Sequence, residues 1–350
     1  LITSKTYEVL MSNLKSKNLN ALVASFKKKD PKGYGRIIKE SMGLKIIEEK
    51  DADDNQRKIQ EVNSGLYLME TSYIKKYLNS LDDKNESGEF YLTDLMKVEE
   101  RVGSHVFGDA SEFLGVNDLV QLDNAREILQ KRINETHMRN GVMIINPSTV
   151  SIEPSVEIES GAIIYAHTEL RGDSYIASEA IIESGCHIKN SKILTKAIIK
   201  SNSYLEGASI GENSQIGPMA RLREGSHIAS DCKIGNFVET KKSKLDQGVK
   251  VSHLSYVGDA EIGENTNIGC GFITCNYDGE NKHQTIIGKN SFIGSDCQTV
   301  APIEIGSSCF IGSGSTINKN VPDNAFAIAR QKQVTKEDMA KRFLKQSKKS

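Results

Sequence analysis

Aliphatic residues recur at every sixth position through the second half of the chain. The repeat runs without a slip from Ile152 to Ile188, and after two five-residue steps it continues to Ile234. Glycine often follows the aliphatic residue. An α-helix repeats every 3.6 residues and an ordinary strand alternates every two, so neither accounts for a strict period of six. The period predicts a parallel β-helix in which short strands form stacked triangular coils.

The predicted coils extend from about Ile152 to Ile317, which amounts to roughly nine turns if three hexads complete one triangle. Two segments break the rhythm, residues 236–244 and 270–285. Because the repeats themselves build the fold, we expect functional side chains at these departures from the repeat.

The first half of the chain has no hexad and is typical of a mixed α/β domain. Leu10, Leu14 and Leu19 suggest a helix, and residues 21–25 form a short apolar strand. From residue 118 a helical stripe of aliphatic residues leads to a stop at Asn140-Gly141. The predicted fold class is thus α/β plus all-β. Its segments are an α/β domain (1–117), a linker helix (118–141), the β-helix (142–322) and a C-terminal tail (323–350).

Composition and charge limit the partners and the cellular compartment that we expect for this protein. The formal net charge is −1, so general attraction to nucleic acid or to acidic membranes has no support. No apolar run is long enough to span a membrane and the N-terminus has no signal-peptide pattern, so we expect a cytoplasmic protein. The chain begins with Leu1 rather than Met, which suggests a fragment whose start lies upstream.

Cysteines and the basic tail have plain interpretations. All six cysteines lie in the predicted coils and none forms a CxxC pair, so we expect reduced, coil-packing thiols rather than a zinc site.

Basic residues near the end form either a solvated tail or a contact with an anionic cofactor. They are Lys336, Lys341, Arg342, Lys345, Lys348 and Lys349.

Candidate chemistry gathers around the two breaks. His253 lies between them, and Glu239, fourteen residues earlier, is close to one coil away, where it could orient the imidazole. Cations suited to a phosphate monoester surround this region: Arg223, Lys241, Lys242 and Lys282. Asn267, Asn276 and Tyr277 could bind sugar hydroxyls. Taken one at a time, these residues are equally typical of solvated coil corners.

A series of motifs in fixed order is more selective. It comprises Arg221-Leu-Arg223, Gly235-Asn-Phe-Val-Glu-Thr-Lys-Lys242, His253-Leu-Ser-Tyr256, Gly258-Asp-Ala-Glu-Ile-Gly263 and Ile273-Thr-Cys-Asn-Tyr-Asp-Gly279. With these motifs the chain closely resembles the bifunctional bacterial enzymes that are both glucosamine-1-phosphate N-acetyltransferase and N-acetylglucosamine-1-phosphate uridyltransferase. The match continues in the first half through Asp30-Pro-Lys-Gly-Tyr-Gly-Arg36 and Gln60-Glu-Val-Asn-Ser-Gly65, and it covers essentially the whole chain.

The resemblance implies an acetyl-transfer site on a left-handed β-helix. His253 matches the general base and Glu239 the carboxylate that supports it. The residues matching the glucosamine 1-phosphate site are Arg223, Lys241, Tyr256, Asn267 and Lys282. The residues matching the acetyl-CoA site are Cys270, Asn276, Tyr277, Ser295, Ser313 and Arg330. Alanine is usual in the family at the positions of Cys270 and Ser313, and both substitutes are small enough to keep the cofactor slot.

The same resemblance implies that the first domain is the C-terminal part of a Rossmann-like nucleotidyltransferase. The residues matching the UDP-N-acetylglucosamine site are Tyr34, Gly35, Glu48, Asn63 and Asn117, and Asn117 also matches a ligand of the catalytic Mg²⁺. The family's Gly-rich loop for the nucleoside triphosphate and a second metal ligand fall before Leu1. Uridylyl transfer from UTP is therefore expected only of a full-length parent.

The family's product feeds UDP-N-acetylglucosamine synthesis, and thereby peptidoglycan and, in some bacteria, lipopolysaccharide. Family members are homotrimers with sites built from more than one subunit, so we expect a homotrimer here. Two alternatives stay open: a hexapeptide-repeat acyltransferase for another amino sugar, and a non-catalytic sugar-nucleotide-binding scaffold in which the β-helix only trimerises.

Overall fold

The computed structural model describes residues 1–40, 43–85, 88–97 and 101–344. The chain forms two compact units, Leu1–Leu129 and Gln130–Ser350. Lys345, Lys348 and Lys349 of the basic tail lie outside the described residues. Among the helices that are described, none has the length and apolar character needed to cross a lipid bilayer.

The first unit is built on a five-stranded sheet in the order β3-β2-β4-β1-β5. Its strands are β1 (Ala21–Lys27), β2 (Arg36–Glu40), β3 (Gly43–Ile47), β4 (Glu61–Met69) and β5 (Val102–Phe107). The central strand β1 runs parallel to β5 and antiparallel to β4. The helices are α1 (Ser4–Ser16) and α2 (Thr71–Tyr77). Leu10 and Leu14 of α1 are buried, whereas Leu19 follows the helix. The mixed α/β prediction is confirmed.

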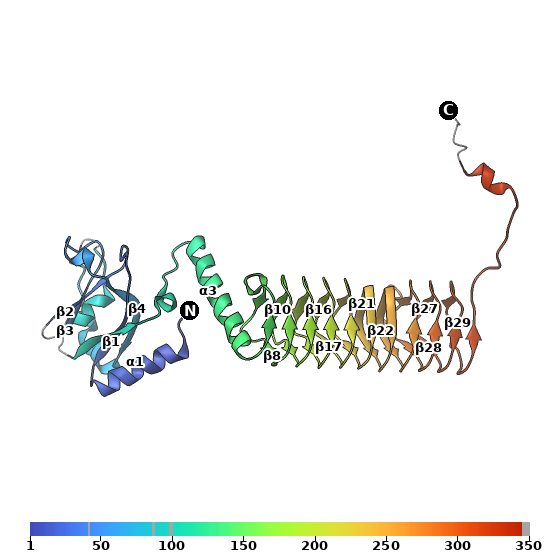
Figure 1. Cartoon of the computed structure of the whole chain (residues 1–350), viewed down its shortest axis with the longest axis horizontal. Coiled ribbons are helices and arrows are strands. Elements are labelled where there is room, and N and C mark those ends of the chain that lie inside the picture. Colours follow the sequence, from blue (N-terminus) through green and yellow to red (C-terminus); the bar gives the residue numbers. More distant parts are fainter. Residues whose placement is uncertain (41–42, 86–87, 98–100, 345–350) are drawn as a thin grey trace, which may run out of the picture. The chain divides into compact units, whose positions relative to one another are not determined.

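The second unit is a left-handed parallel β-helix of about 10 turns, one more than predicted. Figure 1 shows the coils stacked one on the next from β8 to β29. Three parallel ladders run through it, and their strands recur in strict rotation. The triangular coil expected from three hexads is therefore present.

The strands of each ladder follow in chain order. The first ladder contains β6 (Met143–Ile144), β9 (Ile163–Ile164), β12 (Ile181–Ile182), β15 (Ile198–Ile199), β18 (Gln215–Ile216), β23 (Asn267–Ile268), β26 (Phe292–Ile293), β29 (Phe310–Ile311) and β31 (Phe326–Ala327). The second contains β7 (Ser151–Ile152), β10 (Glu169–Arg171), β13 (His187–Lys189), β16 (Tyr204–Glu206), β19 (Arg221–Leu222), β24 (Ile273–Cys275), β27 (Gln298–Val300) and β30 (Thr316–Ile317). The third contains β8 (Glu157–Ile158), β11 (Tyr175–Ile176), β14 (Lys192–Ile193), β17 (Ala208–Ile210), β20 (Ser226–Ile228), β25 (Thr285–Ile287) and β28 (Ile303–Ile305). Two long strands, β21 (Lys233–Leu245) and β22 (Lys250–Ile262), pass through all three ladders.

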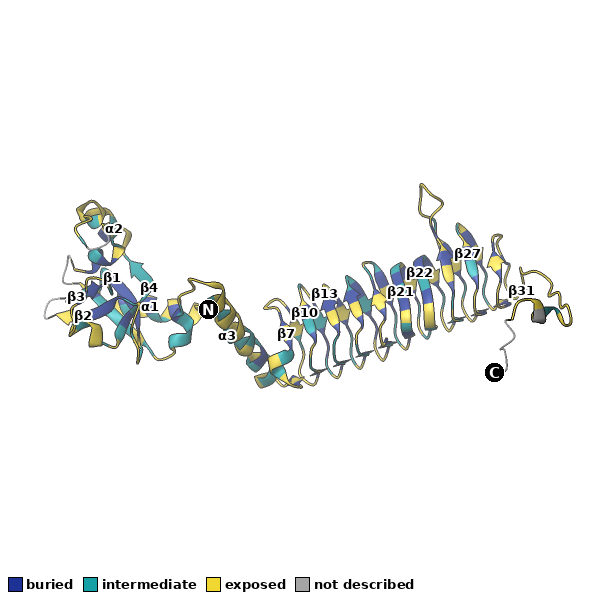
Figure 2. Cartoon of the chain, turned by 90° about the horizontal axis from the view of Figure 1, so that it is seen from above, coloured by how far each residue is buried: buried dark blue, intermediate teal, exposed yellow. Residues whose placement is uncertain are grey.

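The hexad aliphatics point into the coils and form one continuous core. Ile164, Leu170, Ile216 and Ile234 are among those with no exposed surface. Figure 2 shows the alternation of buried and exposed positions along the stacked strands. Removing such a side chain from water stabilises the fold by about 1.5–3 kcal/mol. The repeat is therefore the pattern of a core rather than of a surface.

Glycine keeps adjacent coils close where the backbone itself is the neighbour. A Cβ atom on Gly235 would lie 1.8 Å from the carbonyl oxygen of Ser252 in the next coil. No side-chain rotation relieves that contact, because the obstructing atom is backbone. Gly235 thus sets the spacing of β21 and β22 at the coil that carries the candidate site.

The two breaks in the rhythm turn out to differ. The first, at residues 236–244, is part of the continuous strand β21, and Thr240 occupies the interior position with no exposed surface. Its hydroxyl donates to Ser226 Oγ at 2.8 Å, so a polar side chain is satisfied within the core. The second contains a true excursion, residues 276–284 between β24 and β25. It stands out from the coils in Figure 2.

Helix α3 (Leu119–Arg139) falls within the range expected for a linker helix. In its second half the amide of Asn134 is buried and donates to the carbonyl oxygens of Pro147 and Val150 at 2.8 and 3.0 Å. Ile133 and Met138 pack against the coil core. The C-terminal half of α3 therefore covers the open end of the first coil.

We expect Ile216→Ala to lower the free energy of unfolding by about 2–5 kcal/mol, because it removes a fully buried side chain and leaves a cavity between coils. The matched control is Ile286→Ala, since Ile286 is 38% exposed on the outside of the third ladder. Thermal denaturation followed by circular dichroism at one protein concentration compares them. Equal melting temperatures for the two variants would contradict the assignment of the hexad to the core.

Candidate functional site

Two adjacent coils and the excursion bring three cations together. Arg223 follows β19, and its backbone N–H donates to the carbonyl of Thr240 at 2.9 Å, which sets Lys241 one coil further along the same column. The ammonium of Lys282, on the excursion, lies beside Lys241 and is the main cause of the lowered pKa of Lys241, to which Arg223 adds. Asp259 acts in the opposite direction. The three cations therefore repel one another, and an anion between them would relieve that repulsion.

Within the described residues, no carboxylate forms an ion pair with Lys241 or Lys282. Arg223 is held differently, because its Nη1 lies 2.9 Å from Oε1 of Glu239. Glu239 sits on β21, where it pairs with Arg221 of the preceding coil. One carboxylate thus fixes the guanidinium while both ammonium groups stay available to a ligand.

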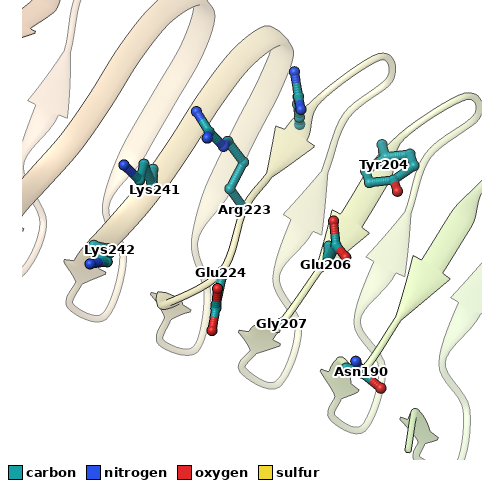
Figure 3. A pocket seen from close by; sticks show the side chains of 9 residues that line it. Asn190, Tyr204, Glu206, Gly207, Arg223, Glu224, Lys241 and Lys242 are labelled. Carbon is teal, nitrogen blue, oxygen red and sulfur yellow. The ribbon is translucent and has the colours of Figure 1, made fainter. Parts of the chain in front are cut away.

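A hollow of about 440 Å³ opens beside this group. Figure 3 shows the side chains of Arg223 and Lys241 extending on the same side from neighbouring coils. The lining residues are Asn190, Tyr204, Glu206, Gly207, Arg221, Arg223, Glu224, Lys241 and Lys242. Four cations and two carboxylates line it, so it favours an anionic ligand.

Tyr256 belongs to the same part of the second ladder. It pairs with Glu239, and its ring lies over Gly258, where an added Cβ would be 2.3 Å from the phenol oxygen. Gly258 in turn pairs with Lys241. The missing side chain at Gly258 therefore lets the Tyr256 hydroxyl approach the column of Arg223 and Lys241.

His253 lies on β22 at the corner between the first and second ladders, and its side chain is exposed. Its Nδ1 is 2.9 Å from Oδ1 of Asn236, the residue directly opposite it in β21. The expectation that Glu239 stacks on His253 is wrong for a single chain, because the coil step here is 17 residues rather than 14. Glu239 instead stacks under Tyr256, on the far side of the corner. Sequence reasoning missed Asn236.

A column of small residues continues from His253 along that corner. Gly271 donates to the carbonyl of Leu254, Asp296 to that of Cys270, and Gly314 to that of Ser295, each at 2.7–2.8 Å. These bonds stack Cys270, Ser295 and Ser313, in that order, and all three are exposed. At the end of the column Arg330 Nη1 donates to the Ser313 carbonyl at 2.8 Å. Four of the six positions matched to acetyl-CoA thus form one row that starts next to His253, and the other two, Asn276 and Tyr277, lie on the excursion.

The excursion is an ordered hairpin. Tyr277 pairs with Lys282 in an antiparallel bridge, and Asn276 donates from Nδ2 to the carboxylate of Asp259. Backbone N–H groups, chiefly that of Asn281, together with His283, hold the pKa of Asp278 well below its usual range. The hairpin therefore has its own polar network, which carries Lys282 to the side of Lys241.

Asn267 is not part of this group in one chain. It pairs with Lys250 and Phe292 in the first ladder, whereas Arg223, Lys241 and Tyr256 lie on the second. The residues matched to the sugar site are therefore split between two faces of the β-helix.

In the first unit, Gly35, Glu48 and Asn63 lie together. A Cβ on Gly35 would be 3.3 Å from both carboxylate oxygens of Glu48, and Asn63 donates from its backbone to the Gly35 carbonyl at 2.8 Å. Burial raises the pKa of Glu48. The amide of Asn63 donates to the hydroxyl of Tyr67 at 2.7 Å, and burial raises the pKa of that phenol to about 12. These groups form a small polar cluster on neighbouring strands.

Tyr34 and Asn117 make other contacts. The Tyr34 ring meets Phe26 edge-on at 5.6 Å between centroids, and the Lys28 ammonium lies 4.4 Å from its centroid. The backbone N–H of Asn117 donates to the side chain of Gln121 at 2.7 Å. No group of three or more metal-binding side chains occurs in the described part of the chain. A single amide oxygen does not satisfy the six-coordinate preference of Mg²⁺, so Asn117 alone does not make a metal site.

Two family models match parts of the β-helix. Residues 147–231 match the model of the GMPPB C-terminal domain, and residues 284–319 match that of the bacterial transferase hexapeptide (six repeats). A solved structure of LpxA from Acinetobacter baumannii is similar over 54% of this chain and 71% of its own, with 18% identity and a TM-score of 0.38, which is too distant to carry any weight.

Curated relatives are much closer. The bifunctional protein GlmU of Staphylococcus haemolyticus is 43% identical over 348 residues, which cover 98% of this chain and 77% of the relative. GlmU of Listeria welshimeri is 41% identical over 98% of this chain and 76% of its own length. This similarity spans both units, and the chain therefore belongs to the family of the bifunctional protein GlmU.

Proposed function

We propose that this chain transfers the acetyl group of acetyl-CoA to the amine of glucosamine 1-phosphate, giving N-acetylglucosamine 1-phosphate. The observation that carries the proposal is the cluster of Arg223, Lys241 and Lys282, which leaves positive charge uncompensated on the second ladder, on coils adjacent to the one that carries His253. A sugar phosphate supplies the missing anion, and membership of the GlmU family supplies the reaction.

In the proposed mechanism His253 is the general base. The neutral amine attacks the thioester carbonyl while His253 accepts an amine proton, a step that contributes about 10²–10⁴-fold in rate. Collapse of the tetrahedral centre forms the amide bond and breaks the carbon–sulfur bond. The leaving thiolate of CoA takes up the proton that His253 accepted, so the base is regenerated and atoms and charges balance. No acyl-enzyme is needed, and the free cysteines need not react.

For the acceptor we assign Arg223, Lys241 and Lys282 to the phosphate and Tyr256 and Asn267 to the sugar. Glu239 contributes by holding Arg223 through their 2.9 Å contact. Asn267 lies on another ladder, which is the arrangement expected if the first ladder of one subunit faces the second ladder of a neighbour. We therefore propose a homotrimer with each acetyl-transfer site shared between subunits.

For acetyl-CoA we assign the column of Cys270, Ser295 and Ser313, which ends at Arg330, together with Asn276 and Tyr277 of the excursion. The column supports this assignment because its side chains are small and exposed and it begins beside His253. Arg330 provides a cation for the charged portion of the cofactor.

For the first unit we propose UDP-N-acetylglucosamine binding by Tyr34, Gly35, Glu48, Asn63 and Asn117. Uridylyl transfer from UTP, with Mg²⁺ at Asn117, is proposed for a chain that also contains the nucleotide-binding loop. The domain limits proposed for the whole are 1–117, 118–141, 142–322 and 323–350. The cytoplasmic setting expected from the sequence stays a prediction.

His253→Ala should lower the rate of acetyl transfer by about 10²–10⁴-fold while the protein remains folded, because the variant loses the proton acceptor. Release of CoA, followed with a thiol reagent, measures the rate. The matched control is His227→Ala, since His227 is also exposed on the β-helix, where it contacts Ser209. Full activity of the His253 variant would refute the assignment of the base. Absence of CoA release by the parent with any amino sugar would favour the scaffold alternative.

Lys241→Gln should lower kcat/KM for glucosamine 1-phosphate by about 10- to 100-fold, since a charge-assisted hydrogen bond to phosphate contributes about 1.5–3 kcal/mol. It should leave the slow reaction of unphosphorylated glucosamine nearly unchanged. Lys244→Gln is the control, because Lys244 lies on the same strand but pairs with Asp246. Equal loss with both acceptors would show that Lys241 does not bind the phosphate, and a parent that prefers free glucosamine would favour another amino sugar.

Light scattering at micromolar concentration should give a mass three times the 38.6 kDa of one chain. Association stabilises the β-helix because a single stack of short strands buries less surface than one packed against neighbours. A sharp monomeric mass in an active sample would rule out sites shared between subunits.

A further inference from the structure

The imidazole of His253 has one side-chain hydrogen bond among the described residues, and its partner is Asn236. The 2.9 Å contact joins Nδ1 of the ring to Oδ1 of the amide. The two residues are direct partners in the parallel pairing of β21 with β22. The contact is therefore imposed by the register of two 13-residue strands and not by a flexible loop.

Local backbone geometry reinforces this placement. Phe237 and Leu254, which follow the two residues, both have positive φ values, 58° and 35°. Both strands thus turn the same corner immediately after Asn236 and His253, and their side chains leave the corner in the same direction. Gly235, whose Cβ would strike the Ser252 carbonyl, allows the close approach of the two strands at this point.

Hydrogen-bond chemistry then determines the state of the ring. The oxygen of a carboxamide accepts and cannot donate, so the bond requires a proton on Nδ1. In a neutral imidazole that proton leaves the lone pair on Nε2. We propose that Asn236 is a positioning residue that holds His253 as the Nδ1–H tautomer and presents Nε2 to the amine of the acceptor. This inference rests on the acetyl transfer proposed above.

The groups around His253 are consistent with Asn236, rather than Glu239, orienting the imidazole. On β21 the nearest carboxylate, Glu239, lies beyond the corner and contacts Arg223. On the other side of His253 the next coil presents Cys270, which is small and exposed. A neutral amide orients the base without adding a negative charge beside it, whereas a carboxylate in its place would favour the protonated ring. Asn236 therefore orients His253, while Glu239 orients the acceptor clamp.

The experiment compares Asn236→Ala, Asn236→Asp and Glu239→Gln by steady-state kinetics across pH with acetyl-CoA and glucosamine 1-phosphate. Asn236→Ala should lower kcat by about 10- to 100-fold with little change in either KM, because a misoriented base slows the chemical step. Asn236→Asp keeps an acceptor for Nδ1–H, so it should recover much of kcat. Its carboxylate raises the pKa of the imidazole, so the acidic limb of the kcat/KM profile should move to higher pH.

Glu239→Gln should act mainly on the KM for glucosamine 1-phosphate. Asn213→Ala is the matched control, because Asn213 is an amide at another coil corner, where it contacts Asp231. Wild-type kcat in Asn236→Ala would overturn the inference, as would an unmoved pH profile and no recovery of kcat in Asn236→Asp. A parent that releases no CoA would instead count against the proposed function.

A second readout is independent of catalysis. Nitrogen NMR of the ¹⁵N-histidine-labelled protein above the imidazole pKa distinguishes the two neutral tautomers, and His253→Gln assigns the signal. The parent should show the Nδ1–H form at His253, and Asn236→Ala should shift it toward the Nε2–H form. An Nε2–H tautomer in the parent would overturn the inference whatever the kinetics show.

Discussion

Stacking of one coil on the next is the interaction on which the second unit depends. Interior aliphatic side chains fill the triangle, and backbone hydrogen bonds between parallel strands hold each coil to its neighbours. Register follows from these two requirements together. The lateral neighbour of a side chain is therefore the residue one coil away, 17 positions from Asn236 to His253 and 18 from Arg223 to Lys241. The chemistry of the site is built from columns across coils rather than from a contiguous motif.

A rigid stack also explains how like charges are tolerated side by side. Arg223 and Lys241 project from adjacent coils, and the excursion adds Lys282. Their repulsion opposes folding, but the core beneath is continuous and mainly aliphatic, so the coils do not separate to relieve it. Preorganised cations bind an anion at a lower cost than cations that must first rearrange, which is the role proposed for these three residues. Glu239 pairs with Arg223 alone, so one of the three positive charges is compensated and those of the two lysines are not.

The sequence predicted much of the fold and only part of the site. Hexad spacing was enough to predict a triangular coil, and the structure confirms it from Ile152 to Ile317. The break at residues 236–244 interrupts the aliphatic repeat but not the strand, because Thr240 keeps the interior place with a hydroxyl that the core satisfies. Glu239 was placed next to His253 because a separation of fourteen residues was taken as close to one coil, whereas one coil here is 17 residues. Asn236 gave no local signal, since asparagine is common at coil corners.

The recurrence of an aliphatic residue at every sixth position by itself determined that this chain forms a β-helix, because no other regular structure buries every sixth side chain. Motif order by itself also determined the family, since those residues recur in one fixed series. Only the tertiary structure decided which side chains meet: Asn236 with His253, Glu239 with Arg223, and Lys282 with Lys241. It also decided that Asn267 lies on a separate ladder from the cations. The physical reason is that contacts between coils depend on the length and turning angle of every corner between them. A short stretch of sequence does not specify these lengths and angles.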